Sequence, residues 1–186
     1  MACAPPPGFV DTPHPEIIPG AAMVAHTEQI LVQGRPQDVI ARVDAAPLEA
    51  VLPKTRDLPG VIGTHDLTPP PFHAPGSRRI VCLSDGAQAV EQVLERDPLQ
   101  FRYVVWNYTT AAARPVDYAI GHFRYEDAGD GKTRIIWTYA FRLRSDRFPG
   151  VLGGLGRWLM KAAFLDRAYA VLMRETLAAM KRHAEA

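Results

Sequence analysis

The sequence predicts an α+β fold in which a curved antiparallel sheet packs on one long C-terminal helix. Three runs between residues 101 and 143 have the two-residue period of β-strands. Residues 151–184 lack proline and repeat apolar side chains at intervals of three and four, the spacing of an amphipathic helix. Because a sheet must cover its apolar face, this helix is the element expected to cover it.

The other predicted elements precede these in order. A strand over 23–32 ends before Gly34, and Pro36 can begin a short helix because the first helical turn needs no N–H donor from it. A second helical turn over 48–52, a short strand over 61–67 and a proline-rich link over 68–76 follow. The remaining expected strands span 79–83, 87–95, 101–108, 116–125 and 134–143, the first two joined by the turn residues Ser84, Asp85 and Gly86.

The chain of 186 residues, with 47% hydrophobic and 22% charged residues, is expected to form one domain over residues 21–186. Residues 1–20 contain six prolines, which predicts either an extended arm on the surface or a disordered tail. Prolines are excluded from central strands, so we expect this arm to be dispensable for folding. Cys3 and Cys82 lack CxxC spacing and are both expected to be free thiols.

Charge and composition argue against several classes of partner. The net charge of +1 offers no broad positive surface for nucleic acid. The sequence contains neither an apolar run long enough to span a membrane nor a secretory signal, which predicts a cytoplasmic protein. No metal-ligand spacing, complete nucleotide-binding loop or nucleophile motif is present, so neither a metal nor a cofactor is expected. The chain could be a monomer or a homodimer.

An ordered set of residues resembles a known family over roughly residues 22–184. The set comprises Arg79-x-x-x-Leu83-x-Asp85-Gly86, Glu91-x-Val93, Asp97, Tyr103, Pro115-x-x-Tyr118 and Trp137-x-x-x-Phe141. It is similar to the START-like (SRPBCC) superfamily, in its polyketide cyclase/dehydrase branch. The resemblance implies a helix-grip fold with a largely apolar cavity between sheet and helix. Members of this superfamily bind lipids, sterols, polyketides or plant hormones, and a minority catalyse reactions.

Strand alternation predicts which side chains face this cavity, independently of the resemblance. The aromatic face of 134–143 is expected to point inward, while Arg102 and Asp117 mark the outer faces of their strands. The predicted ligand-binding residues are Arg79, Val81, Tyr103, Val105, Asn107, Tyr118, Ile120, Trp137, Tyr139 and, on the C-terminal helix, Leu159. For the aromatic members the alternative is ordinary core packing.

Glu91 and His122 are the candidate catalytic residues, both predicted to face inward. An unpaired buried carboxylate is unfavourable, so Glu91 should pair with Arg79, ligand or water, or else act as a general acid or base. His122 could be a base, although a histidine flanked by apolar residues is more often a hydrogen-bonded core or rim residue. A carboxylate and an imidazole converging on one substrate atom would favour an enzyme.

Three classes of function therefore stay open. The leading hypothesis is a protein that binds an apolar or aromatic small molecule of polyketide, terpenoid or lipid type. Such a protein could also act as a lyase or isomerase, catalysing cyclisation, dehydration or addition by positioning and acid–base chemistry. The alternative is a non-catalytic carrier or sensor. A third class, an assembly module without ligand, requires the cavity to be filled by the aromatic side chains.

Overall fold

The computed structural model describes residues 3–69 and 72–186, so Pro70 and Pro71 of the predicted proline-rich link lie outside the described residues, as do the first two residues of the arm. Within this part of the chain the strands are β1 (Val24–Gln33), β2 (Val61–Asp66), β3 (Arg78–Leu83), β4 (Gln88–Asp97), β5 (Gln100–Trp106), β6 (Val116–Gly129) and β7 (Lys132–Leu143). They form one antiparallel sheet in the order β1-β7-β6-β5-β4-β3-β2.

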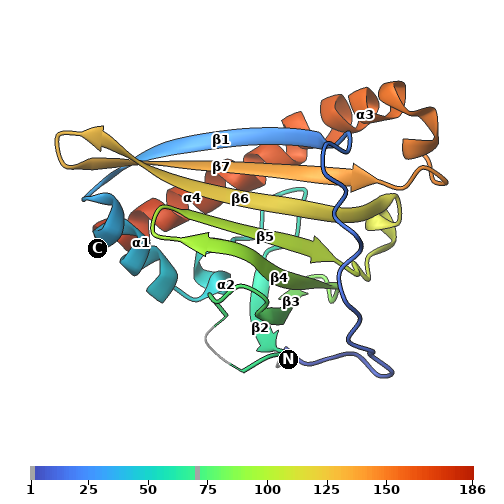
Figure 1. Ribbon diagram of the computed structural model, residues 1–186, viewed down its shortest axis with the longest axis horizontal. Helices are drawn as coiled ribbons and strands as arrows, with labels where there is room; N and C mark the ends of the chain where they lie inside the picture. Colours follow the sequence, from blue (N-terminus) through green and yellow to red (C-terminus); the bar gives the residue numbers. More distant parts are fainter. Residues whose placement is uncertain (1–2, 70–71) are drawn as a thin grey trace.

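The helices connect and cover this sheet. They are α1 (Pro36–Ala45), α2 (Leu48–Val51), η1 (Ala111–Ala113), η2 (Gly150–Leu152), α3 (Gly154–Met160), the π-helical segment η3 (Lys161–Tyr169) and α4 (Ala170–Glu185). In Figure 1 α4 runs behind the sheet, whereas the N-terminal arm crosses in front of it. The predicted α+β helix-grip fold is therefore confirmed, with one face of the sheet against a helix and the other under the arm.

The C-terminal helix differs from its predicted form in its first half. Met173 and Met180 are buried as the apolar stripe requires, but Leu152 and Leu155 are exposed. The π-helical turns of η3 change the angle between successive side chains. Apolar residues spaced three and four apart therefore do not all face the sheet on both sides of this segment. The part of the helix that packs on the sheet accordingly begins near Leu165, which is fully buried.

Two apolar clusters lie on opposite faces of the sheet. The inner cluster joins side chains of the sheet to those of the C-terminal helix, including Trp137, Tyr139, Met173 and Leu177. The outer cluster is formed by Val90, Val104, Trp106, Tyr118 and Ile120, and Phe9, Ile17 and Met23 pack against it. The sheet is thus apolar on both faces, and the N-terminal segment covers the outer cluster in place of a second layer of helices.

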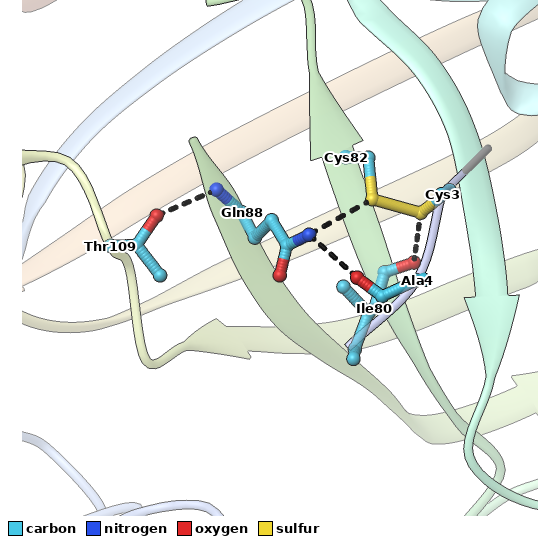
Figure 2. Close-up of a disulfide and its surroundings, with 6 residues drawn as sticks. All are labelled: Cys3, Ala4, Ile80, Cys82, Gln88 and Thr109. Carbon is cyan, nitrogen blue, oxygen red and sulfur yellow. Dashed lines mark hydrogen bonds between the residues drawn. A yellow bond between two sulfur atoms is a disulfide. The ribbon is translucent and has the colours of Figure 1, made fainter. Parts of the chain in front are cut away.

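A disulfide bond attaches this arm to the sheet. Cys3 is bonded to Cys82 of β3 across 79 positions of sequence. Figure 2 shows the side-chain amide of Gln88 donating a hydrogen bond to the backbone oxygen of Ala4, 2.8 Å away. Asp11 forms a second attachment, an ion pair of 2.9 Å with Arg78. The prediction of two free thiols is wrong, because the extended arm brings Cys3 back over the outer face of β3.

Because of these contacts, we now expect the N-terminal arm to contribute to the stability of the fold, contrary to the prediction from sequence that it is dispensable. Cys3→Ser should lower the free energy of unfolding by about 2–4 kcal/mol under oxidising conditions, because the bond closes a long loop in the unfolded chain. Cys82→Ser should have the same effect, and dithiothreitol should remove the difference between wild type and either variant. Equal chemical denaturation curves for wild type and Cys3→Ser without reductant would contradict this expectation.

Candidate functional site

A buried ion pair lies on the inner face of the sheet. Arg79 of β3 and Glu91 of β4 are directly opposite each other in the antiparallel register. The Arg79 Nε donates a hydrogen bond of 2.7 Å to Glu91 Oε2, and the two side chains are 14% and 8% exposed. The guanidinium also lies 3.7 Å from the centre of the Phe72 ring, a cation–π contact. The predicted pairing of Glu91 with Arg79 is confirmed in the structure.

Aromatic side chains fill the space between this ion pair and the C-terminal helix. The ring centres of Tyr139 and Tyr169 are 4.9 Å apart, and that of Tyr103 lies 6.2 Å from Tyr139. Trp137 stacks on Phe123 at 4.9 Å. The region where the resemblance implied an apolar cavity is therefore occupied by side chains in contact, so a ligand there would have to displace some of them.

Glycine at position 121 makes this packing possible. Gly121 lies between Tyr103 and Tyr139 in the register of β5, β6 and β7. A Cβ atom at this position would be 2.0 Å from the Tyr103 ring. Non-bonded carbon atoms do not approach each other that closely. The absence of a side chain at Gly121 therefore lets the Tyr103 ring lie across the inner face.

The buried tyrosine side chains are neutral near physiological pH. Burial raises the pKa of Tyr103, Tyr108, Tyr139 and Tyr169 well above the usual value for tyrosine, and it also raises that of Tyr125. Glu91 acts in the same direction on Tyr103, since a nearby negative charge disfavours a phenolate. These groups stay neutral at physiological pH and can donate hydrogen bonds, but none is a base.

Alkaline stability follows from the same shifts. A buried tyrosine has a higher pKa in the folded state than the value of about 10 in the unfolded state. It therefore contributes its full stabilisation below about pH 10, and this contribution is lost as the pH rises through the folded-state pKa. We expect the ultraviolet absorbance of tyrosinate to appear together with the loss of circular dichroism rather than before it. Ionisation of most tyrosines near pH 10 in the still-folded protein would contradict the burial of these phenols.

A hollow of about 480 Å³ opens at the end of the sheet beside this aromatic region. It is lined by Asn107, Tyr108, Ala113, Arg114, Val116, Asp117, Arg144, Asp146 and Arg147. Its charged groups are three arginines and two aspartates. Arg144 lies 3.8 Å from Asp117 and Arg147 lies 3.7 Å from Asp146, so both carboxylates have a cationic neighbour while Arg114 has no ion pair in the described structure.

Tyr108 connects this hollow with the aromatic region. The backbone of Asn107 has a φ of 58°, a left-handed conformation that asparagine adopts more readily than most residues. β5 ends just before this residue, and Tyr108 packs against the inner cluster although strict alternation would place it outside. Asn107 and Tyr108 also line a second, smaller hollow of about 130 Å³. The buried Tyr108 hydroxyl lies near the Tyr139 phenol but forms no hydrogen bond of regular geometry.

The predicted site residues divide between the two faces. Tyr103, Val105, Trp137 and Tyr139 belong to the inner cluster, and Glu91 lies opposite Val105 on the same face. Val81 is buried opposite Ala89 of the inner cluster. Arg79 pairs with Glu91, and Asn107 lines both hollows. Leu159 of α3 is half-buried and does not belong to the inner cluster.

The inward prediction is wrong for Tyr118, Ile120 and His122. Tyr118 and Ile120 belong to the outer cluster under the arm, while Ala119 and Phe123 belong to the inner one. The cause is a register shift in β6 between Val116 and Tyr118, because an extra residue in a strand reverses the alternation beyond it. Asp117, the predicted marker of the outer face, lies in this irregularity.

His122 is therefore separated from Glu91 by the sheet itself. Its Nε2 lies 3.2 Å from Gln100 Oε1 on the outer face. Partial burial lowers the pKa of His122, and the positive charges of Arg124 and Arg102 lower it further. The imidazole and the Glu91 carboxylate do not converge, so the predicted pair of catalytic residues is not assembled.

Sequence reasoning missed Tyr108, Arg114, Arg144 and Arg147. These residues lie in or next to the irregular segments that join strands at one end of the sheet, where periodicity gives no orientation. The sequence signal that could have indicated Tyr108 is the asparagine before it, since asparagine after a strand favours a turn and so an end to the strand alternation.

Over residues 3–69 and 72–186, no three histidine, cysteine, aspartate or glutamate side chains are close enough to share a metal ion. No helix there combines the length and the apolar character needed to cross a membrane.

The fold and this arrangement of residues define a helix-grip protein. It has a buried Arg79–Glu91 ion pair on the inner face of the sheet and a hollow at one end of the sheet. Residues 23–185 match the family described as "Polyketide cyclase / dehydrase and lipid transport", and the chain belongs to this family. The START-like resemblance is thereby confirmed. A comparison with curated proteins finds no match.

Solved structures show the same fold at low sequence identity. The Zhui aromatase/cyclase from Streptomyces sp. R1128 is 13% identical, with a TM-score of 0.61 over 88% of this chain and 94% of that one. The di-domain ARO/CYC StfQ of the steffimycin biosynthetic pathway is 14% identical, with a TM-score of 0.61, and 88% of this chain covers 51% of it. Ginseng major latex-like protein 151 from Panax ginseng is 13% identical, with a TM-score of 0.57 over 87% and 97% of the two chains.

Proposed function

We propose that this protein binds an amphipathic small molecule of polyketide, terpenoid or lipid type at the hollow beside Tyr108. The apolar part of the ligand would contact the aromatic side chains under the C-terminal helix, and its oxygen functions would remain among the arginines. A volume of about 480 Å³ falls within the range of small-molecule sites. The membership in a family described by polyketide chemistry and lipid transport supports this class of ligand.

The observation that carries the proposal is the Tyr108 hydroxyl. It belongs to a residue that lines the hollow, is buried, and forms no hydrogen bond of regular geometry, although the Tyr139 phenol lies near it. Leaving a buried hydroxyl fully unsatisfied costs about 1–3 kcal/mol, and a ligand oxygen in better geometry than the Tyr139 phenol would remove whatever part of this cost remains. Tyr108 would then act as a donor to the ligand, as its raised pKa requires.

The charges of the hollow favour a ligand with an acidic or strongly polar end. Arg114, Arg144 and Arg147 line it together with Asp117 and Asp146, which leaves an excess of positive charge. Arginine also binds carboxylate or phosphate oxygens through two parallel hydrogen bonds. The inner face, with its neutral phenols and one ion pair, suits the carbonyl and hydroxyl groups of the rest of the ligand.

Entry requires the aromatic side chains to move, and the chain has a segment suited to this motion. Gly150, Gly153, Gly154 and Gly156 surround the start of the C-terminal helix, and the π-helical η3 follows them. Gly153 has open space around its Cβ position and Gly154 has only a flexible arginine side chain near its own, so the backbone can rearrange there. Gly150 and Gly156, in contrast, are glycines because a Cβ would clash with the backbone oxygens of Arg144 and Pro149. The proposed opening separates this junction from the loop that carries Tyr108.

A carrier or sensor is the form of this function that the geometry supports best. Glu91 is held by Arg79, His122 lies on the other face, and the phenols are neutral. Catalysis of cyclisation, dehydration or addition stays a second proposal, in which Glu91 would move a proton after the ligand displaces Arg79. Glu91→Gln would then lower turnover about 10²-fold with little change in binding.

The cellular location is also part of the proposal. The composition predicted a cytoplasmic protein, whereas the Cys3–Cys82 disulfide is typical of an oxidising environment. Whether Cys3 and Cys82 are oxidised or reduced in protein isolated from its host under alkylating conditions distinguishes an oxidising location from the cytoplasm.

Titration with anilinonaphthalene sulfonate, a fluorescent apolar anion, tests the site. We expect one bound probe per chain, with an affinity reduced at least about fivefold by Arg144→Gln, which removes the positive charge and the paired donors of the guanidinium, and by Tyr108→Phe, which removes a hydroxyl donor. Arg124→Gln and Tyr118→Phe make the same chemical changes on the outer face and should leave the affinity unchanged. No stoichiometric binding, or equal losses in both pairs of variants, would contradict the proposal.

A further inference from the structure

An exposed apolar surface surrounds the start of the C-terminal helix. Phe148, Val151, Leu152, Leu155 and Trp158, here called the junction patch, all lie within eleven residues and are all exposed. Phe148 is 68% and Trp158 is 63% exposed. In Figure 1, α3 lies at the end of the sheet where β1 begins and β7 ends. Exposed apolar clusters of this kind mark interaction sites rather than ordinary protein surface.

The same segment is positively charged. Residues 144–167 contain five basic and two acidic residues, a net charge of +3, although the whole chain carries only +1. Arg147 precedes the patch, and Arg157 and Lys161 lie within and just after it. Asp146 and Asp166 are the two carboxylates of the segment, and they face Arg147 and Lys161 respectively. Arg157 has no ion pair in the described structure.

The junction patch also adjoins the hollow. Arg144, Asp146 and Arg147 line the hollow, and the next residue, Phe148, begins the patch. A surface that covered the patch would therefore lie beside the opening through which we expect ligand to enter.

From these three observations we propose that the junction patch docks on an anionic lipid surface. Aromatic and aliphatic side chains between basic residues are the composition of segments that insert into the interface of a bilayer. A second copy of the chain fits less well, because a symmetric pairing of this patch would bring Arg147, Arg157 and Lys161 of both copies together. The inference goes beyond ligand binding, since it concerns the surface on which the protein would take up or release a lipid-like molecule.

Vesicle flotation tests this proposal with the full chain. We expect the protein to float with vesicles of phosphatidylcholine and phosphatidylglycerol, and far less with phosphatidylcholine alone. The double variant Leu155→Ser, Trp158→Ser should lower the partition coefficient at least about tenfold. Arg157→Gln with Lys161→Gln should lower it by about fivefold per charge, with the larger effect at low salt.

A matched control uses exposed apolar residues elsewhere. Ile62 and Leu99 are 48% and 45% exposed, and Ile62→Ser with Leu99→Ser should leave the partition coefficient unchanged. Trp106 and Trp137 are buried, so a blue shift of tryptophan fluorescence on addition of anionic vesicles reports on Trp158. Thermal melting of each variant shows that the surface substitutions leave the fold intact.

Three results would overturn the proposal. These are no binding to anionic vesicles, equal binding by wild type and the patch variant, and a dimer in light scattering that the patch variant alone dissociates. The last result would show that a second copy covers the patch. Probe titration of the hollow in the absence of vesicles is independent of all three, so a failure of lipid docking is distinguishable from a failure of ligand binding.

Discussion

Arg79→Met should lower the free energy of unfolding by about 3–5 kcal/mol, because it leaves the Glu91 carboxylate buried without a compensating charge. The two side chains are 14% and 8% exposed and share a hydrogen bond of 2.7 Å. Methionine keeps most of the volume and the apolar contact with Phe72, so the loss would measure the charge rather than the packing. Urea denaturation monitored by circular dichroism gives the value.

A second ion pair provides the control. Arg102 and Glu95 are separated by the same 2.7 Å but are 33% and 57% exposed, so Arg102→Met should change the stability by less than about 1 kcal/mol. The double variant Arg79→Met, Glu91→Leu should recover most of the stability lost by Arg79→Met alone, since no buried charge is left. Equal effects of Arg79→Met and Arg102→Met would mean that water reaches the inner pair.

Gly121→Ala should destabilise the fold by about 3 kcal/mol, at the upper end of the usual cost of overpacking. The new methyl carbon would be 2.0 Å from a ring carbon of Tyr103, and that ring is held between its aromatic neighbours. Neither the central strand β6 nor the stacked ring can move freely to make room. The change should also weaken probe binding, because Tyr103 would be pushed towards the C-terminal helix.

Two further variants isolate this clash. Gly154 of α3 has only a flexible arginine side chain near its Cβ position, so Gly154→Ala should be neutral or slightly stabilising, as alanine favours helix. In a Tyr103→Leu background the ring is absent, and adding Gly121→Ala should cost little more. A full additional loss of about 3 kcal/mol in that background would place the strain elsewhere than at the Tyr103 ring.

The fold was predictable because its main elements have strong and separate signals. The face of β7 that carries Trp137 and Tyr139 alternates cleanly with a face that carries Arg134 and Arg142, so its orientation followed from the sequence. The hairpin turn at Asp85 and Gly86 indicated that the strands carrying Arg79 and Glu91 are neighbours, and the structure supplies the register that places the two residues opposite each other. Alternation and turn chemistry were sufficient for the orientation of β7 and for the neighbourhood of β3 and β4.

The orientation of β6 was not predictable by the same reasoning. Both of its faces are apolar, because the arm covers one and the C-terminal helix the other. The prediction took Asp117 as the marker of the outer face and placed Arg124 with the inward set, but Asp117 lies at the register shift. Tyr118, Ile120 and His122 were therefore all assigned to the wrong face, because a shift of one residue in a strand reverses the face of every side chain that follows.

The candidate site was also only partly predictable, since half of it comes from loops. Arg144, Arg147 and Tyr108 meet at one end of the sheet through tertiary structure, and no periodic pattern places them there. The disulfide escaped prediction for a related reason, because the position of the arm over β3 depends on the outer cluster.

Native mass spectrometry of the protein purified from its own host tests the central claim most directly, since a molecule bound at the hollow should co-purify with the chain. The account predicts one small molecule per chain in wild type and its loss in a variant that combines Tyr108→Phe with Arg144→Gln. The paired outer-face variant, Tyr118→Phe with Arg124→Gln, should retain it. A bare chain in wild type that also fails to bind the fluorescent probe, or a ligand retained equally by both variants, would contradict a binding site beside Tyr108.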